Sequence, residues 1–112
     1  MENPEKLDVL QGTLDLLILR TLVWGPEHGH GIGQTIRSRS GELLQVEHGS
    51  LYPALHRLVR EGWIESEWGV TRNNQRAKFY RLTESGKQHL TVEENRWKLF
   101  VKTMARVMRP QE

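Results

Sequence analysis

The sequence predicts a mainly α-helical protein with one small β-hairpin, and three observations support this class. Its 112 residues are enough for one domain. Four segments repeat apolar residues three and four positions apart, which is the spacing of the buried side of a helix. Two short segments of strand character in the second half are separated by a polar loop around Asn73-Asn74, as in a hairpin.

The first predicted helix, Gly12–Trp24, is apolar on two sides. One stripe consists of Leu14, Leu17, Ile18, Thr21 and Leu22, and the other of Leu16, Leu19 and Val23. A helix of this kind must be covered on both sides. We expect one side to face the core of its own domain and the other to face a further helix, of this chain or of another.

The next segment contains a turn, a second helix and a short strand. Gly25–Gly29 is rich in residues that favour turns. The second helix is expected over His30–Ser40, with Ile32 and Ile36 facing inward. A short strand is expected over Leu44–Val46, within the connector that leads to the third helix.

The third predicted helix, Gly49–Glu61, has one apolar edge and one polar edge. Leu51, Leu55 and Leu58 recur at helical spacing, which predicts that they are buried. The polar groups on the remaining surface belong to Tyr52, His56, Arg57 and Arg60. Hydroxyl, imidazole and guanidinium groups together on one edge are suited to contact a polar partner.

A hairpin and a long helix follow. Strands are predicted over Trp63–Trp68 and Ala77–Leu82, joined by the polar loop Gly69–Arg76. Thr83 is a favourable N-cap for a last helix that extends to Met108.

The predicted order is therefore helix, helix, strand, helix, strand, strand, long helix. This is the order of a winged helix-turn-helix, in which a hairpin is appended to a helical DNA-binding motif. We expect residues 1–82 to form a winged-helix DNA-binding domain. We expect residues 83–112 to form a C-terminal dimerisation helix with a short tail.

Charge and composition limit the function. The net charge is only +2, but residues 70–89 contain five basic residues and one acidic residue, so a nucleic-acid surface is expected there. With no cysteine, no metal-ligand spacing among five histidines and no catalytic motif, we expect no enzyme, metal or cofactor. The lack of a signal-peptide pattern and of a long apolar segment predicts a cytoplasmic protein without a membrane partner.

Four motifs occur along the chain at a particular spacing. They are Gly12-Thr-Leu-Asp-Leu-Leu-Ile-Leu19, Ser50-Leu-Tyr-Pro-Ala-Leu-His-Arg-Leu58, Gly62-Trp-Ile64 and Lys78-Phe-Tyr-Arg-Leu-Thr-Glu-Ser-Gly86. Together they resemble the PadR family of bacterial transcriptional regulators, and the single helix after the hairpin resembles its shorter subfamily. Ile32 departs from the pattern, since the family often has an aromatic residue after His-Gly. The resemblance implies a dimeric winged-helix repressor on a palindromic DNA operator. Some short members bind a flat aromatic compound between protomers.

Candidate DNA-binding residues lie on three segments. On the recognition helix they are His48, Ser50, Tyr52, Pro53, His56 and Arg57. On the wing they are Arg72, Asn73, Asn74, Gln75, Arg76 and Lys78, and on the second helix Gln34 and Arg37. The alternatives are that Ser50 only caps its helix, that Tyr52 packs on the second helix, and that the wing is an ordinary solvated loop. For Trp68, packing within the wing is the interpretation.

The last helix has an apolar seam that predicts a homodimer. The expected interface residues are Leu90, Trp97, Phe100, Val101, Met104 and Met108, with Leu16, Leu19 and Val23 of the first helix. The alternative is that the helix folds back on its own domain. Trp97 and Met104 also suit an aromatic ligand, which would make the regulator ligand-responsive, although the same residues are ordinary packing material. A winged-helix module that binds protein rather than DNA is a further alternative.

Overall fold

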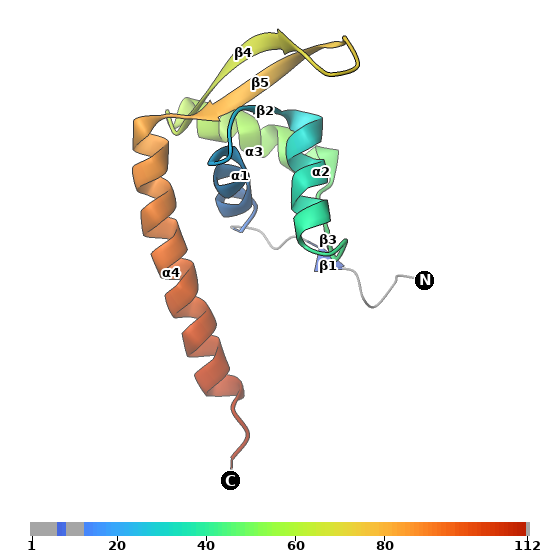
Figure 1. Cartoon of the computed structure of the whole chain (residues 1–112). Coiled ribbons are helices and arrows are strands. Elements are labelled where there is room, and N and C mark those ends of the chain that lie inside the picture. Colours follow the sequence, from blue (N-terminus) through green and yellow to red (C-terminus); the bar gives the residue numbers. More distant parts are fainter. Residues whose placement is uncertain (1–6, 9–12, 112) are drawn as a thin grey trace.

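Three helices pack together, a hairpin projects from one end of them, and a fourth, longer helix leaves the domain (Figure 1). The computed structural model describes residues 7–8 and 13–111. Its elements are β1 (Leu7–Asp8), α1 (Leu14–Leu22), β2 (Glu27–His28), α2 (Gly29–Arg39), β3 (Leu44–Gln45), α3 (His48–Arg60), β4 (Ile64–Val70), β5 (Arg76–Leu82) and α4 (Glu84–Met108). The predicted class, mainly α with a small β-hairpin in a winged helix-turn-helix, is confirmed.

The two sheets are small. β4 and β5 pair antiparallel from Ile64 opposite Leu82 to Val70 opposite Arg76, so the hairpin is longer than predicted. β2 is a third, antiparallel strand on β5, where the sequence predicted only a turn. The expected short strand is β3, which pairs parallel with β1. The first predicted helix was placed from Gly12, which lies outside the described residues, and the division of the chain at residue 82 stays a prediction.

The core joins the three short helices to the base of the hairpin. The largest side chains with no exposed surface, or almost none, are Ile18, Leu19, Ile32, Leu51, Leu55, Leu58 and Ile64. Tyr80 of β5 and Leu90 of α4 also belong to this cluster. The leucines of the apolar edge of α3 are thus buried, as the spacing predicts.

Two of the predicted interface residues belong to this core instead. Leu19 is 0% exposed and Leu90 is 5% exposed within a single protomer, so neither side chain is available to a second copy. These two predictions are wrong. The physical reason is that α1 packs against α2, α3 and α4 of its own chain, which encloses Leu19 and Leu90 in the core of one protomer.

The first half of α4 is anchored to the domain, through Leu90 in the core, an ion pair between Glu94 and Arg20 of α1 (3.3 Å), and a set of contacts at its start. The Thr83 hydroxyl accepts a hydrogen bond from the Gly86 N–H (3.0 Å) and donates one to the Gly62 carbonyl (2.6 Å). The Thr83 N–H donates to the Trp63 carbonyl (3.1 Å), and the Trp63 indole stacks on the His89 imidazole with centroids 3.5 Å apart. Gly62 itself has a φ of +77°, a left-handed conformation that favours glycine. We call these contacts the Gly62–Trp63 joint.

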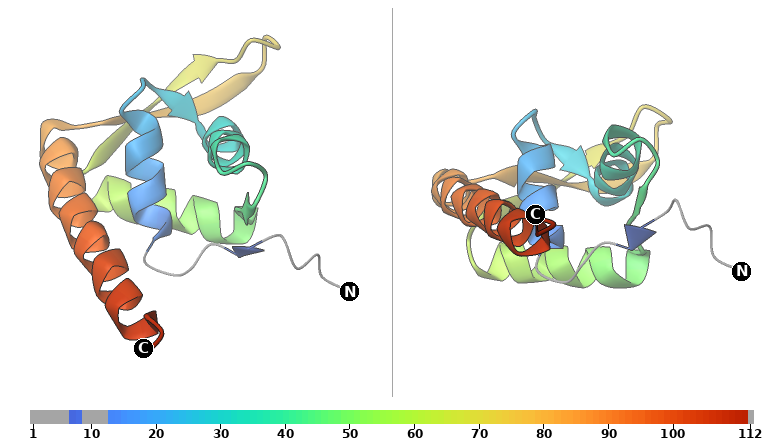
Figure 2. Two further views of the ribbon diagram at one scale, coloured as in Figure 1. Left: turned by 60° about the horizontal axis from the view of Figure 1, so that its bottom comes forward. Right: turned by 90° about the horizontal axis from the view of Figure 1, so that it is seen from below.

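Beyond the joint, α4 leaves the domain. All residues from 95 to 111 are exposed, and Figure 1 and the left view of Figure 2 show the helix extending away from the other elements. The alternative in which the last helix folds back on its own domain is therefore wrong for this structure.

Candidate nucleic-acid interface

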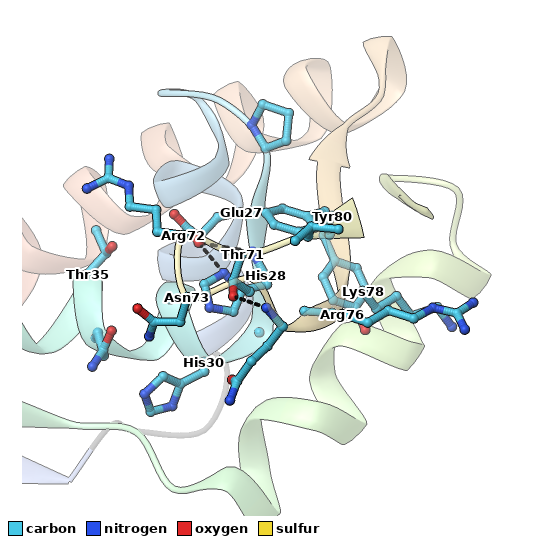
Figure 3. Close-up of a pocket in the computed structure, with 18 of the residues that line it drawn as sticks. Glu27, His28, His30, Thr35, Thr71, Arg72, Asn73, Arg76, Lys78 and Tyr80 are labelled. Carbon is cyan, nitrogen blue, oxygen red and sulfur yellow. Dashed lines mark hydrogen bonds and ion pairs between the residues drawn. The ribbon is translucent and has the colours of Figure 1, made fainter. Parts of the chain in front are cut away.

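The polar edge of α3, the start of α2 and the hairpin surround one open hollow of about 1360 Å³. Its lining includes His30 and Gln34 from α2, Tyr52 and His56 from α3, and most of the hairpin tip (Figure 3). A second, smaller hollow of about 490 Å³ lies beside it, between the starts of α2 and α3. Segments from three distant parts of the sequence thus form one continuous concave surface.

The start of α3 presents the predicted residues to solvent. The helix begins at His48, and Glu47 is its N-cap residue, so the alternative that Ser50 is the cap is wrong. His48, Ser50, Tyr52, Pro53 and His56 are all exposed. The first turn of a helix carries unpaired N–H groups and a partial positive charge, which favours contact with an anion.

A series of aromatic rings connects the starts of α2 and α3. The rings of His30 and His48 have centroids 5.9 Å apart, and those of His48 and Tyr52 are 5.7 Å apart. Gly29 permits this arrangement, since a Cβ atom there would lie 2.8 Å from a ring carbon of Tyr52. Tyr52 therefore packs on α2, as one alternative held, and still remains 38% exposed. Both helix starts consequently face the same side of the molecule.

Arg57 does not join this surface. Its guanidinium donates to the carboxylate of Asp15 in α1 at 2.5 Å, and the residue lines neither hollow. Arg37 also has an acidic partner, Glu42, at 2.6 Å, but that pair is exposed and Arg37 lines the smaller hollow. An exposed ion pair contributes little to stability, about 0–1 kcal/mol, so Arg37 remains available to another anion.

The wing tip is a closed polar turn. The Thr71 N–H donates to the Gln75 carbonyl at 2.8 Å, and the Asn74 N–H donates to the Thr71 carbonyl at 2.9 Å. Asn74 has a φ of 60°, a left-handed conformation that asparagine tolerates better than most residues. Every predicted wing residue is exposed: Arg72, Asn73, Asn74, Gln75, Arg76 and Lys78.

Trp68 is a member of this surface that sequence reasoning assigned only to packing. It lines the larger hollow and is 59% exposed, with the guanidinium carbon of Arg76 4.6 Å from its ring centroid. Strand alternation places Trp68 on the same side as Ile64, which indicates burial. The sequence feature that indicates exposure is the basic character of the neighbouring strand, in which Lys78 is paired directly with Trp68.

Tyr80 marks the boundary between the core and the hollow. It is buried, yet it lines the hollow near the point where the hairpin leaves the core. Burial raises the pKa of the Tyr80 hydroxyl, and the nearby Tyr52 raises it further.

A second exposed surface lies on the distal part of α4. Trp97, Phe100, Val101, Met104 and Met108 are all exposed, as is Val23 of α1, while Leu16 is half-buried. Exposed apolar residues in such number on one helix are unusual for an isolated domain. The aromatic-ligand site at Trp97 and Met104 stays a prediction, and neither hollow described above includes these two residues.

The described residues form neither a metal-binding cluster nor a membrane-spanning helix. Among them, no cluster of three or more histidine, cysteine, aspartate or glutamate side chains is placed to hold a metal ion. None of the helices in that part of the chain combines the length and apolarity needed to cross a membrane.

Several known proteins are similar to this chain in fold and in sequence. The family model "Transcriptional regulator PadR-like family" matches residues 18–92. A transcriptional regulator from Clostridium thermocellum has a TM-score of 0.81 and 29% identity, covering 88% of this chain and 96% of that chain. A PadR family transcription regulator from Clostridium difficile R20291 has a TM-score of 0.75 and 28% identity, covering 88% and 100%. Negative transcriptional regulator PadR of Bacillus subtilis (strain 168) is 32% identical over 77 residues, which are 69% of this chain and 42% of that protein.

The family match and the shared fold therefore place this chain among the winged-helix transcriptional regulators. The chain belongs to the PadR family.

Proposed function

We propose that this protein is a homodimeric, sequence-specific DNA-binding repressor. The observation that carries the proposal is the hollow in which the exposed edge of α3, the start of α2 and a basic hairpin face the same side. A winged helix that binds DNA places its recognition helix in the major groove and its wing on the adjacent backbone. The polar and basic groups gathered here suit those two contacts.

The proposed DNA contacts follow from exposure and position. On α3 they are His48, Ser50, Tyr52, Pro53 and His56, because these residues are exposed at the helix start. On α2 they are Gln34 and Arg37, and on the wing Arg72, Asn73, Asn74, Gln75, Arg76 and Lys78. We leave Arg57 out, because it lines neither hollow.

The proposed dimer uses the exposed stripe of α4. Its residues are Trp97, Phe100, Val101, Met104 and Met108, with Leu16 and Val23 of α1 at the edge. A two-fold axis between the helices would present two α3 helices to one palindromic site, with half-sites roughly 34 Å apart. The direction of regulation is proposed from the Bacillus subtilis relative, whose name describes a negative transcriptional regulator.

Selection of bound DNA from a random library, followed by a salt series on the selected site, tests the function. We expect a palindromic consensus. If the dimer neutralises about 6–10 phosphates, affinity falls about 10³- to 10⁵-fold between roughly 50 and 200 mM salt. A library without enrichment, or binding that does not depend on salt, would contradict the proposal and favour a protein-interaction module.

Tyr52→Ala tests the recognition surface directly. We expect the variant to bind the selected site at least ~1 kcal/mol more weakly, because an exposed hydroxyl and ring at the start of α3 are lost. The dimer should remain intact by light scattering. Arg60→Ala is the matched control, since Arg60 is an exposed residue of α3 that lines neither hollow. Equal affinity of Tyr52→Ala and wild type at the same salt concentration would exclude the assignment.

A further inference from the structure

One face of the hairpin changes character along its length. Ile64 and Tyr80 are buried on this face near the base. Farther out, the same face carries Trp68 and Val70, which are 59% and 62% exposed. The apolar face of the hairpin therefore continues beyond the end of the core. Because a large indole gains no stability from exposure to water, its position there indicates contact with a partner.

Two cations accompany the exposed indole. The Lys78 ammonium lies 5.9 Å from the centroid of the Trp68 ring, and the Arg76 guanidinium lies 4.6 Å from it. Lys78 is paired directly with Trp68 in the sheet, and Arg76 is paired with Val70. Cations at these distances are attracted to the ring face and hold its orientation. The outer half of this face thus combines apolar surface with positive charge.

The acidic residues of β4 are on the opposite face. Glu65 and Glu67 alternate with Ser66 and Trp68 along the strand, so their side chains point to the other side of the sheet. Glu65 is moreover paired with Arg81 at 2.7 Å. No acidic side chain of the hairpin therefore balances Arg76 and Lys78 on the face that carries Trp68.

The position of this face relative to α3 indicates its partner. Trp68, Arg76 and Lys78 line the same hollow as Tyr52 and His56 of α3. Arg76 and Lys78 extend to one side of the hairpin, and Asn73 extends to the other (Figure 3). Polar groups on both sides of a thin hairpin match the two phosphate backbones that flank a DNA groove.

We propose that Trp68 is a DNA-contacting residue whose indole packs on the deoxyribose faces of the groove wall while Arg76 and Lys78 bind the adjacent phosphates. The proposal rests on the proposed DNA-binding function and deepens it. Sugars present C–H surface directly beside phosphate oxygens, so an indole between two cations is complementary to this wall in both shape and charge. The contact adds affinity that is independent of base sequence.

Binding titrations with the selected DNA and with an unrelated duplex test this role. For Trp68→Ala we expect a loss of roughly tenfold in affinity for both duplexes. The slope of log affinity against log salt should stay that of wild type, because an apolar contact releases no counterions. Arg76→Ala should instead reduce the slope by about one. Trp24→Ala is the matched control, because Trp24 is also exposed beside an arginine but does not line the hollow, and it should bind as wild type does.

Acrylamide quenching separates direct contact from an effect on the neighbouring cations. The fluorescence of Trp68 is obtained as the difference between the tryptophan emission of wild type and that of Trp68→Phe. We expect acrylamide to quench this emission less when DNA is bound. Unchanged affinity of Trp68→Ala, a salt slope as low as that of Arg76→Ala, or an unprotected Trp68 would each overturn the proposal. If the wild-type protein binds no DNA at all, the proposed function is wrong. If the wild-type protein binds DNA and Trp68→Ala binds it with the same affinity, only the Trp68 contact is excluded.

Discussion

The hairpin tip and the distal half of α4 both project beyond the core, but they expose different kinds of side chain. The outer face of the hairpin carries Arg76 and Lys78 around one indole, and its loop is polar. The outer half of α4 carries a stripe of aromatic, aliphatic and thioether side chains, among them Trp97, Val101 and Met104.

The difference indicates two kinds of partner. Cations around an exposed ring suit a polyanion, because charge supplies long-range attraction and the ring supplies contact area. An apolar helical stripe gains stability only by burial against another apolar surface. Both segments project beyond the core, and their side chains are the basis for proposing nucleic acid as the partner of the hairpin and a second protomer as the partner of α4.

The largest expected effect comes from disrupting the Gly62–Trp63 joint, where the start of α4 meets the base of the hairpin. In Gly86→Ala the new Cβ atom would overlap the backbone carbonyl oxygen of Trp63, which cannot rotate away. We expect the free energy of unfolding in urea to fall by roughly 3 kcal/mol. Gly49→Ala is the control, because a Cβ atom there meets no atom within 4 Å. A fully stable Gly86→Ala protein would show that α4 is not held by the Gly62–Trp63 joint.

The next effect concerns only the distal part of α4 and the dimer proposed there. Val101→Glu places a charge in the apolar stripe, so we expect the dimer to dissociate at micromolar concentrations while the circular dichroism of the folded domain persists. Light scattering measures the mass. Asn95→Glu adds the same charge to the exposed part of α4, but on a different side of the helix, and should remain dimeric. A Val101→Glu protein that stays dimeric would exclude the stripe as the interface.

The smallest effect tests where the core ends along the hairpin. Burial raises the pKa of Tyr80 above the ordinary value of 10.0, so the folded state holds this proton more tightly than the unfolded state. The resulting stability is complete below pH 10.0 and is lost as the pH rises through the folded-state pKa. The free energy of unfolding, measured with urea, should therefore fall more for wild type than for Tyr80→Phe when the pH is raised above 10.0. Parallel curves for the two proteins would place the Tyr80 hydroxyl in solvent.

Helical spacing was sufficient to predict the helices, the apolar edge of α3 and the projecting seam of α4. Those features depend on local periodicity, which the sequence contains directly. β2 was missed because two residues have no detectable alternation, and their strand conformation comes from pairing with Tyr80 and Phe79. The position of Leu19 depends on which neighbours cover α1, a property of packing rather than of the stripe itself.

Site residues were predictable where exposure followed from the helix or loop alone. His56 and the wing tip are examples, since both are exposed as the pattern implies. Arg57 was not, because its partner Asp15 is 42 positions away in the sequence and only the packing of α1 on α3 brings the two together. Packing was predicted for Trp68 because strand alternation shows which face of the sheet a side chain occupies. It does not show how far along the strand the buried core extends.

The Gly62–Trp63 joint gives α4 the properties of a lever arm. The helix has 25 residues, and at 1.5 Å per residue it is about 37 Å long. A rotation of about 5° at the joint would therefore displace the far end by roughly 3 Å. Since the joint lies between the end of α3 and the start of β4, α3 and the hairpin would turn together relative to α4. In the proposed dimer, the angle at which α4 leaves each domain would consequently set the distance between the two α3 helices.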